Sequence, residues 1–269
     1  MSERWVDGDP LASVSPFRRG EDQEVAGLLA ALLAYGRVDA FRRHTAEVLR
    51  SLGPHPADRL RSGVPSLPDL RYRFHTAADI RALLTGIRTM LARHGRLASA
   101  MRSHLDREKL LRPALKAWVD ELASAAGSGG PGLRFLLSDP ARGGACKRWL
   151  LYLRWMIRAD SDGADTGAWS DLFEPRLLVI PLDTHIARIG RRLGLTARVT
   201  PDWRMAEEIT SALSIVHPGD PVRYDLPLCH LGIRGYCPSR LMPSHCGRCP
   251  LAMVCPTAPR RARATFRSA

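Results

Sequence analysis

Four cysteines near the C-terminus have the spacing of a metal-binding loop. The pattern Cys-x8-Cys-x2-Cys-x5-Cys is formed by Cys237, Cys246, Cys249 and Cys255. Four thiolates in a short loop suit either a [4Fe–4S] cluster or a tetrahedral zinc ion. A zinc ribbon would favour two C-x2-C pairs with a longer spacer between them, whereas this loop has one such pair and unequal spacing. We therefore favour iron–sulfur, with zinc as the alternative, and interpret Cys146 and Cys229 as packed thiols.

Lysine is scarce in this chain, which draws attention to the few that are present. The 40 basic residues comprise 37 arginines and the lysines Lys109, Lys116 and Lys147. A guanidinium is always protonated and makes a poor nucleophile, so a lysine can mark a place where an amine is required. Lys147 follows the pair Gly143-Gly144 at the start of a predicted helix, where free backbone N–H groups can hold a phosphate. Lys147 is thus a candidate nucleophile; the alternative is a solvated cation that contacts phosphate.

Asp183 opens the segment Asp-Thr-His at the start of another predicted helix. Aspartate is a favoured N-cap, so this carboxylate could be purely structural, and His185 could be a packing or hydrogen-bonding residue rather than a base. The chain combines a glycine turn with a lysine, then Asp-Thr-His, and then a four-cysteine loop. This combination is less common than any one of the motifs alone. In that order, the three features favour functional over purely structural roles for Lys147 and Asp183.

The elements that would position these residues are helices. Residues 22–35 are almost wholly apolar behind an acidic start, which predicts a buried central helix capped by Asp22 and ending at Gly36. Residues 38–52 have one apolar face and one charged face. Further helices are predicted at 76–94, 97–105, 108–124, 132–138, 145–158, 184–194, 202–215 and 221–234. Because no convincing two-residue alternation occurs, we predict an all-α fold, with a proline-rich connector at 54–68.

Composition narrows the class of partner. The 269 residues carry a formal net charge of +13 with a sequence pI near 10.3, which favours a polyanion: nucleic acid first, an anionic membrane surface second. The 45% hydrophobic content excludes a disordered chain.

The acidic segment 160–167 starts like a calcium loop but lacks the closing glutamate. No apolar stretch reaches the roughly 20 residues of a membrane span, so we expect a cytoplasmic protein without a membrane partner.

The order of these motifs resembles the helix-hairpin-helix DNA glycosylases of the endonuclease III and MutY superfamily, and is most similar to an uncharacterised prokaryotic branch of it. The resemblance extends over about residues 20–257. It rests on the Asp-Thr-His segment, the cysteine loop and the short segments 22–25, 34–37, 146–148, 154–158 and 220–225.

The resemblance implies roles for individual residues. Lys147 would form the Schiff base at C1′ and Asp183 would assist base loss. The four cysteines would hold a [4Fe–4S] cluster that shapes a DNA-contacting loop. DNA would be bound by Gly143, Gly144, Arg148, Arg240 and Arg248.

The expected organisation is an N-terminal extension (1–20), an all-α helix-hairpin-helix fold (21–235), a cysteine-rich cluster loop (236–257) and a basic tail (258–269). The expected function is a DNA glycosylase with AP lyase activity in base-excision repair, acting as a monomer on duplex DNA with a lesion, at the nucleoid. Two alternatives stay open: a noncatalytic iron–sulfur protein that binds nucleic acid, and an enzyme of the same fold directed at RNA or nucleotides.

Overall fold

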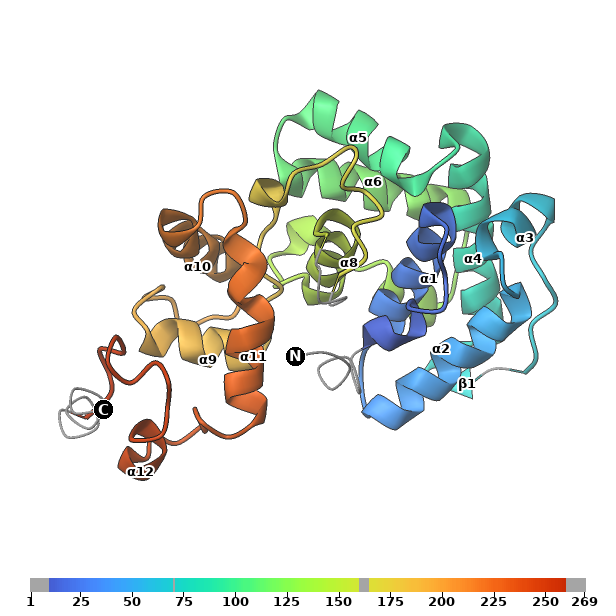
Figure 1. The fold of residues 1–269 in the computed structure, drawn as a ribbon. Helices are drawn as coiled ribbons and strands as arrows, with labels where there is room; N and C mark the ends of the chain where they lie inside the picture. Colours follow the sequence, from blue (N-terminus) through green and yellow to red (C-terminus); the bar gives the residue numbers. More distant parts are fainter. Residues whose placement is uncertain (1–9, 70, 160–164, 260–269) are drawn as a thin grey trace. The chain divides into compact units, whose positions relative to one another are not determined.

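The chain is mostly helical in a computed structural model that describes residues 10–69, 71–159 and 165–259, and this confirms the all-α class. In the described part, the only strands are the two-residue pair β1 and β2. The elements in chain order (Figure 1) are η2 (Pro10–Ser13), α1 (Gly20–Leu33), α2 (Val38–Leu52), α3 (Pro56–Ser62), β1 (Arg71–Tyr72), β2 (His75–Thr76), α4 (Ala77–His94), α5 (Leu97–Glu108), α6 (Leu111–Ala126), α7 (Pro131–Leu136), η3 (Pro140–Arg142), α8 (Lys147–Ile157), η4 (Pro175–Leu177), α9 (Thr184–Arg192), α10 (Trp203–Val216), η5 (Pro221–Tyr224), α11 (Asp225–Ile233) and α12 (Pro243–Cys246).

The chain divides into two compact units. Unit 1 comprises Met1–Arg142 with Leu151–Leu177, and unit 2 comprises Gly143–Leu150 with Leu178–Ala269. The first turn of α8 therefore belongs to unit 2 and the rest of that helix to unit 1. None of the described helices combines the length and the apolar composition needed to cross a bilayer.

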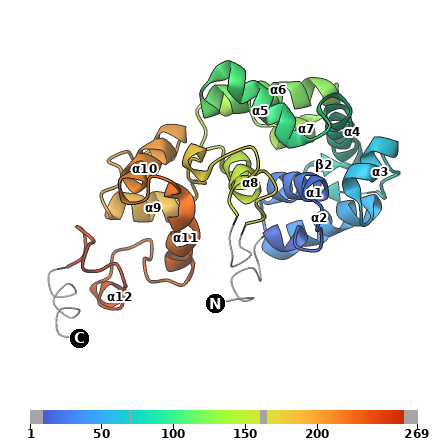
Figure 2. The ribbon, with the colours of Figure 1, turned by 45° about the horizontal axis from the view of Figure 1, so that its top comes forward.

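Helix α1 lies at the centre of unit 1. Every residue from 25 to 33 is buried, as expected for a helix that is apolar around its whole circumference. The amphipathic α2 and the short α3 pack against it, as does η2, where Leu11 contributes to the core. Helices α4, α5 and α6 pack against one another (Figure 2). The apolar side chains along one face of each helix are buried.

The predicted role of Asp22 as the N-cap of α1 is wrong. The helix begins at Gly20, and its N-cap residue, Arg19, makes no side-chain capping bond. Asp22 is buried, and its Oδ1 instead accepts a hydrogen bond from the backbone N–H of Ala57 at 3.0 Å, in the first turn of α3. Because α3 has no side-chain cap of its own, this carboxylate from another helix takes that place.

The same arrangement recurs at two other helices that lack local caps. Glu24 Oε2 accepts from the N–H of Leu97, at the start of α5, at 2.7 Å. Asp79, which also forms a capping box with Thr76 in α4, accepts at Oδ1 from the N–H of Leu133, in α7, at 3.1 Å. Buried carboxylates therefore join helix starts that are far apart in sequence.

Glu24 is the most buried of these acids, with no exposed surface. Its Oε1 accepts from Arg96 Nε at 3.1 Å, and Arg96 also pairs with Asp171 at 2.8 Å. Burial raises the pKa of Glu24, and hydrogen bonds from Leu97 and Arg96 oppose this shift without cancelling it.

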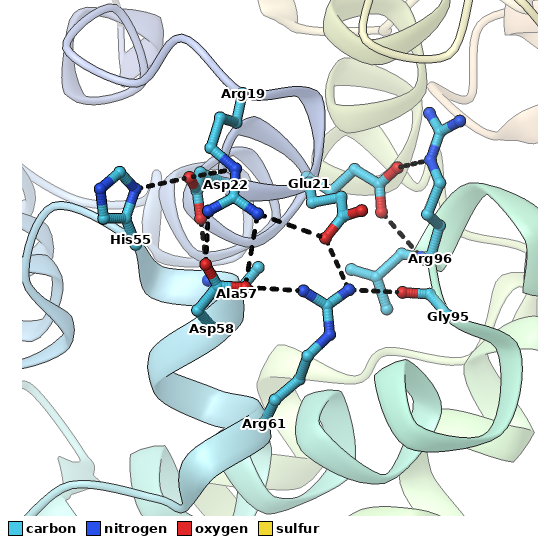
Figure 3. Close-up of polar contacts among 11 residues, drawn as sticks. Arg19, Glu21, Asp22, His55, Ala57, Asp58, Arg61, Gly95 and Arg96 are labelled. Carbon is cyan, nitrogen blue, oxygen red and sulfur yellow. Dashed lines mark hydrogen bonds and ion pairs between the residues drawn. The ribbon is translucent and has the colours of Figure 1, made fainter.

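An outer ring of ion pairs surrounds these buried contacts (Figure 3). Arg19 pairs with Asp58 and approaches Asp22, while Arg61 pairs with Glu21 at 2.6 Å and with Asp58 at 3.0 Å. These groups are partly exposed, so each pair contributes little alone. Together they hold the start of α1 against α3.

Several sequence predictions change in detail. The expected connector 54–68 contains helix α3, whose start at Pro56 suits the fixed backbone of proline. A short hairpin, β1–β2, was missed because two-residue strands are too short to show alternation. Much of the acidic segment and the basic tail lie outside the described residues.

Besides the first turn of α8 and the short α12, unit 2 comprises α9, α10, η5 and α11. Helix α11 lies beside α9 (Figure 1), and α10 contacts both α9 and η5. Ile186 and Ile189 of α9 face a core that includes Trp203 and Ile209 of α10. A Cβ added at Gly190 would lie 2.7 Å from Ile209, so glycine permits the close approach of these two helices.

Glu24→Gln should lower the free energy of unfolding by about 2 kcal/mol or more, because it removes the charge that Arg96 faces in a buried site. Glu108→Gln, an exposed change on the last turn of α5, should stay within about 0.5 kcal/mol of wild type. Urea unfolding followed by circular dichroism measures both. Equal stability of the two variants would contradict a stabilising role for the charge of Glu24 beside Arg96.

Candidate active site

Lys147 and Asp183 lie together in unit 2. Lys147 Nζ is 3.4 Å from Asp183 Oδ2, although 36 residues separate them in the chain. The lysine side chain is 47% exposed and the aspartate side chain 14%. An amine that solvent can reach thus meets a carboxylate that is largely shielded from it.

The turn before α8 positions Lys147 as the first residue of that helix. Gly143 adopts φ +82°, a region that favours glycine, and Gly144 pairs with Asp202 in an isolated antiparallel bridge. Cys146 adopts φ +51°, which is uncommon for a residue with a side chain. Both glycines are exposed, as is Lys147 itself.

Asp183 is the N-cap of α9, as predicted. Its Oδ1 accepts from the N–H groups of His185 and Ile186, each at 2.8 Å. Burial acts to raise the pKa of Asp183, but the charge of Lys147 and the hydrogen bond from Ile186 outweigh it, and the pKa lies below its ordinary value. The carboxylate is therefore charged at neutral pH, and its second oxygen is directed at the amine.

Cys229 is a third member of this site, which the sequence alone did not indicate. Its thiol donates to Asp183 Oδ2 at 3.3 Å, the same oxygen that faces Lys147. Burial raises the pKa of Cys229 well above the ordinary range, and the charge of Asp183 adds to the shift. A thiol that stays protonated is a hydrogen-bond donor and not a nucleophile.

His185 packs between α9 and α11. Its Nδ1 lies 2.9 Å from Arg188 Nη2, which fits the hydrogen-bonding role considered from the sequence. A Cβ at Gly232 would lie 2.3 Å from the same ring nitrogen, so only glycine lets α11 approach here. Since Gly232 lies one turn after Cys229, this approach also sets the distance of the thiol from Asp183.

The four C-terminal cysteines line one small cavity of about 30 Å³. The sulfur atoms share its wall with apolar groups, among them Leu241, Met242 and Ala252, and no His, Asp or Glu contributes to it. Across the described residues, no three His, Cys, Asp or Glu side chains converge closely enough to count as a ligand set for a metal ion. The cavity therefore offers an all-sulfur donor set without a converged coordination geometry.

Helix α9 connects the carboxylate to the cysteine loop. Asp183 caps its start, and Arg192 in its last turn donates to Cys237 Sγ at 3.1 Å and to the carbonyl oxygen of Pro238 at 2.6 Å. Arg188 Nε donates to the carbonyl oxygen of Cys237 at 2.9 Å. A nine-residue helix is about 13 Å long, so the carboxylate and the loop contact opposite ends of one helix.

The residues predicted to contact DNA fall in two places. Arg148 follows Lys147 and is half-buried, whereas Arg240 and Arg248 are exposed on the cysteine loop. No ion pair neutralises Arg240 or Arg248 within the described ranges, so both cations can meet an outside anion. No bond among the described residues joins Arg240 or Arg248 to Lys147.

The remaining two lysines have ordinary roles. Lys109 is the C-cap residue of α5, with φ +64°, and Lys116 pairs with Asp120 one turn along α6. Of the three, Lys147 alone contacts a carboxylate outside its own helix.

Residues 9–234 match the family described as a protein of unknown function, DUF2400, and because this match covers most of the chain, the protein belongs to that family. Neither the curated proteins nor the solved structures contain a match.

The resemblance to the endonuclease III and MutY glycosylases is therefore wrong as a family assignment. The family match is to DUF2400, and none is found to the helix-hairpin-helix glycosylases. The segments that suggested it are short, and an aspartate that caps a helix explains much of the Asp-Thr-His segment by local chemistry alone.

Cys229→Ala should raise the pKa of Asp183 toward its ordinary value, because the carboxylate loses a hydrogen-bond donor. Carbon-13 NMR of labelled aspartate measures the titration. The charge of Asp183 stabilises the fold above the unfolded carboxyl pKa, and this contribution is lost as pH falls through the lowered folded value. Cys229→Ala should therefore reduce the acid dependence of stability.

Cys229→Ser keeps a donor and should titrate like wild type. Cys146→Ala is the matched control, since the thiol of Cys146 bonds to the carbonyl oxygen of Gly144. A pKa of Asp183 that is the same in all four proteins would show that the thiol does not act on the carboxylate.

Proposed function

We propose that this protein is a DNA repair glycosylase with an associated AP lyase activity, in which Lys147 is the nucleophile and Asp183 its partner. The observation that carries the proposal is the 3.4 Å contact between the amine and the carboxylate. Lys147 is the only lysine of unit 2 in a chain that otherwise uses arginine, and arginine cannot form an imine. The +13 charge and the exposed arginines favour a polyanionic substrate.

The chemistry begins with an ammonium in contact with Asp183 Oδ2. One proton passes from Nζ, by way of this oxygen, to the departing base. Nζ then bonds to C1′ of the deoxyribose as the bond from C1′ to the base breaks, and the electron pair leaves with the base. The negative charge of Asp183 stabilises the positive charge that develops on the sugar.

A second proton then moves from Nζ to O4′ as the sugar ring opens, which leaves an imine between Lys147 and C1′. This imine is protonated at Nζ. A C2′ proton passes to water, the 3′ phosphate leaves by β-elimination, and a second water hydrolyses the imine and restores the lysine. The target nucleotide must leave the base stack for C1′ to reach Nζ. The exposed backbone at Gly143 and Gly144, just before α8, suits the adjoining phosphate.

We also propose that the cysteine loop holds a [4Fe–4S] cluster, with zinc as the alternative. The four cysteine thiols in the wall of the cavity suit soft metal centres, and the Arg192 guanidinium beside Cys237 suits a thiolate. A bound cluster would supply a rigid cross-link within the loop. Arg240 and Arg248, on that loop, would then be held in place to contact DNA phosphates. Such an enzyme would act as a monomer at the nucleoid.

Borohydride trapping tests the nucleophile. Incubated with a panel of duplexes that carry damaged bases or abasic sites, wild type should form a covalent adduct with at least one, and Lys147→Ala should form none. Asp183→Asn should slow base release by about 100-fold or more. Lys116→Ala is the control, because that lysine pairs with Asp120 in unit 1, and it should behave as wild type. An adduct that persists in Lys147→Ala would refute the mechanism.

The metal is tested separately by colour and metal analysis. The purified protein should be brown, with broad visible absorbance and about four irons per chain. Cys237→Ser and Cys249→Ser should lose iron, whereas Cys146→Ser and Cys229→Ser should retain it. A colourless protein that contains zinc would contradict the iron–sulfur assignment and leave the Lys147 chemistry unaffected.

A further inference from the structure

Unit 1 has an aromatic–arginine surface that the proposed chemistry does not use. It consists of Tyr35, Phe74 and Phe135 with Arg71 and Arg73. The ring centroids of Phe74 and Phe135 are 4.8 Å apart, and that of Tyr35 lies 4.9 Å from Phe135. Three separate segments thus bring their rings together: the end of α1, the β1–β2 hairpin and α7.

Two of these rings face solvent, which is unusual in this chain. Of the five phenylalanines in the described part, Phe17, Phe41 and Phe173 are buried. Phe74 is 46% exposed and Phe135 is 39% exposed. Large apolar groups that gather at a surface commonly mark a binding site.

The hairpin holds Phe74 outward by its geometry. Tyr72 pairs with His75, so Arg73 and Phe74 form a two-residue turn at the tip. Tyr72 and His75 are buried; the Tyr72 hydroxyl donates to the carbonyl oxygen of Tyr35, and His75 Nε2 lies 2.9 Å from the carbonyl oxygen of Gly132. The base of the hairpin is therefore anchored beneath an exposed tip.

Arg73 is held in a strained backbone conformation at that tip. Its φ is +58°, which costs a residue with a side chain about 1 kcal/mol. Its guanidinium carbon lies 5.8 Å from the centroid of the Tyr35 ring, close enough for a cation–π contact. A Cβ at Gly36 would lie 3.1 Å from Arg73 Nη1, so glycine makes room for this arginine.

The charge around the rings is positive and not neutralised. Arg71 and Arg73 are exposed on either side of Tyr72, and across the described ranges neither forms an ion pair with a carboxylate. Arg37 and Arg134, next in sequence to Gly36 and Phe135, are also exposed. Apolar faces beside unpaired cations suit a ligand that carries both flat rings and negative charge.

We propose that this surface binds a nucleic-acid strand by stacking an unpaired base on Phe74, with the flanking phosphates paired to Arg71 and Arg73. Every base has a π face, so the contact is tolerant of sequence. The inference rests on the proposed function for the choice of nucleic acid as partner, and it names residues of unit 1 that take no part in the proposed chemistry.

Phe74→Trp gives a direct readout of stacking. Addition of a short oligothymidylate should quench the emission of the new tryptophan, because a stacked base quenches indole fluorescence. Leu110→Trp is the matched control, since Leu110 is 66% exposed at the start of α6. Equal quenching in the two variants, or none in Phe74→Trp, would overturn the proposal.

Affinity provides the second measurement. Phe74→Ala should weaken oligonucleotide binding by about 10- to 100-fold, and Phe74→Tyr should retain it. Arg73→Ala should lower the slope of log affinity against log salt by about one. Leu110→Ala should match wild type in both respects.

Borohydride trapping in the same proteins separates this inference from the proposed function. If wild type forms the adduct while Phe74→Ala binds oligonucleotide as tightly as wild type, the stacking surface is refuted and the chemistry stands. If no adduct forms with any duplex while Phe74→Ala binds more weakly, the chemistry is refuted and the surface stands.

Discussion

The carboxylate of Asp183 is the interaction on which unit 2 depends. Its two oxygens have different tasks: Oδ1 satisfies the start of α9, while Oδ2 accepts from Lys147 and Cys229. The start of α8 brings a positive charge, and the start of α9 adds the positive end of a helix dipole. A single negative group balances both, so that the first turn of α8, all of α9 and part of α11 share one anchor. The proposed chemistry uses the oxygen that capping leaves available.

In unit 1, the backbone N–H groups at helix starts are paired with carboxylates from other helices. The starts of α3, α5 and α7 have no side-chain caps of their own, and Asp22, Glu24 and Asp79 satisfy backbone N–H groups there. In water these donors would be solvated, but within a packed unit each needs a partner. Burying a carboxylate on an apolar helix costs desolvation free energy. Hydrogen bonds to the helix starts offset this cost, which explains why α1 can contain two buried acids.

Local chemistry made part of this structure predictable. The apolar face of residues 38–52 predicts α2 with its observed bounds, and the capping preference of aspartate predicts the start of α9 at Asp183. Both depend on neighbours within one or two turns. The contact of Cys229 with Asp183 spans 46 positions and follows from the packing of α11 on α9, which Gly232 permits. In the sequence, nothing about Cys229 and Gly232 indicates that Asp183 is their neighbour.

Short motifs also led to the wrong family assignment, because they do not report long-range contacts. The segment Asp-Thr-His fits a capped helix as well as a catalytic segment, and the two interpretations differ only in which residues face Asp183 Oδ2. Those residues are known only from the fold. The hairpin with Phe74 at its tip was likewise hidden, since two residues on each strand are too few to show a period.

The buried carboxylates of α1 have a consequence for synthesis of the chain. Helix α1 leaves the ribosome early, but Asp22 meets Ala57 35 residues later and Glu24 meets Leu97 73 residues later. Arg96, which pairs with Glu24, also bonds to Asp171 and to the carbonyl oxygen of Ala168. Unit 1 therefore cannot close until the chain beyond residue 171 has emerged, by which time the Gly143–Leu150 segment of unit 2 is already present. Until then the almost wholly apolar α1 can pack against η2, α2 and α3 but lacks its later contacts, so part of its surface stays exposed to aggregation.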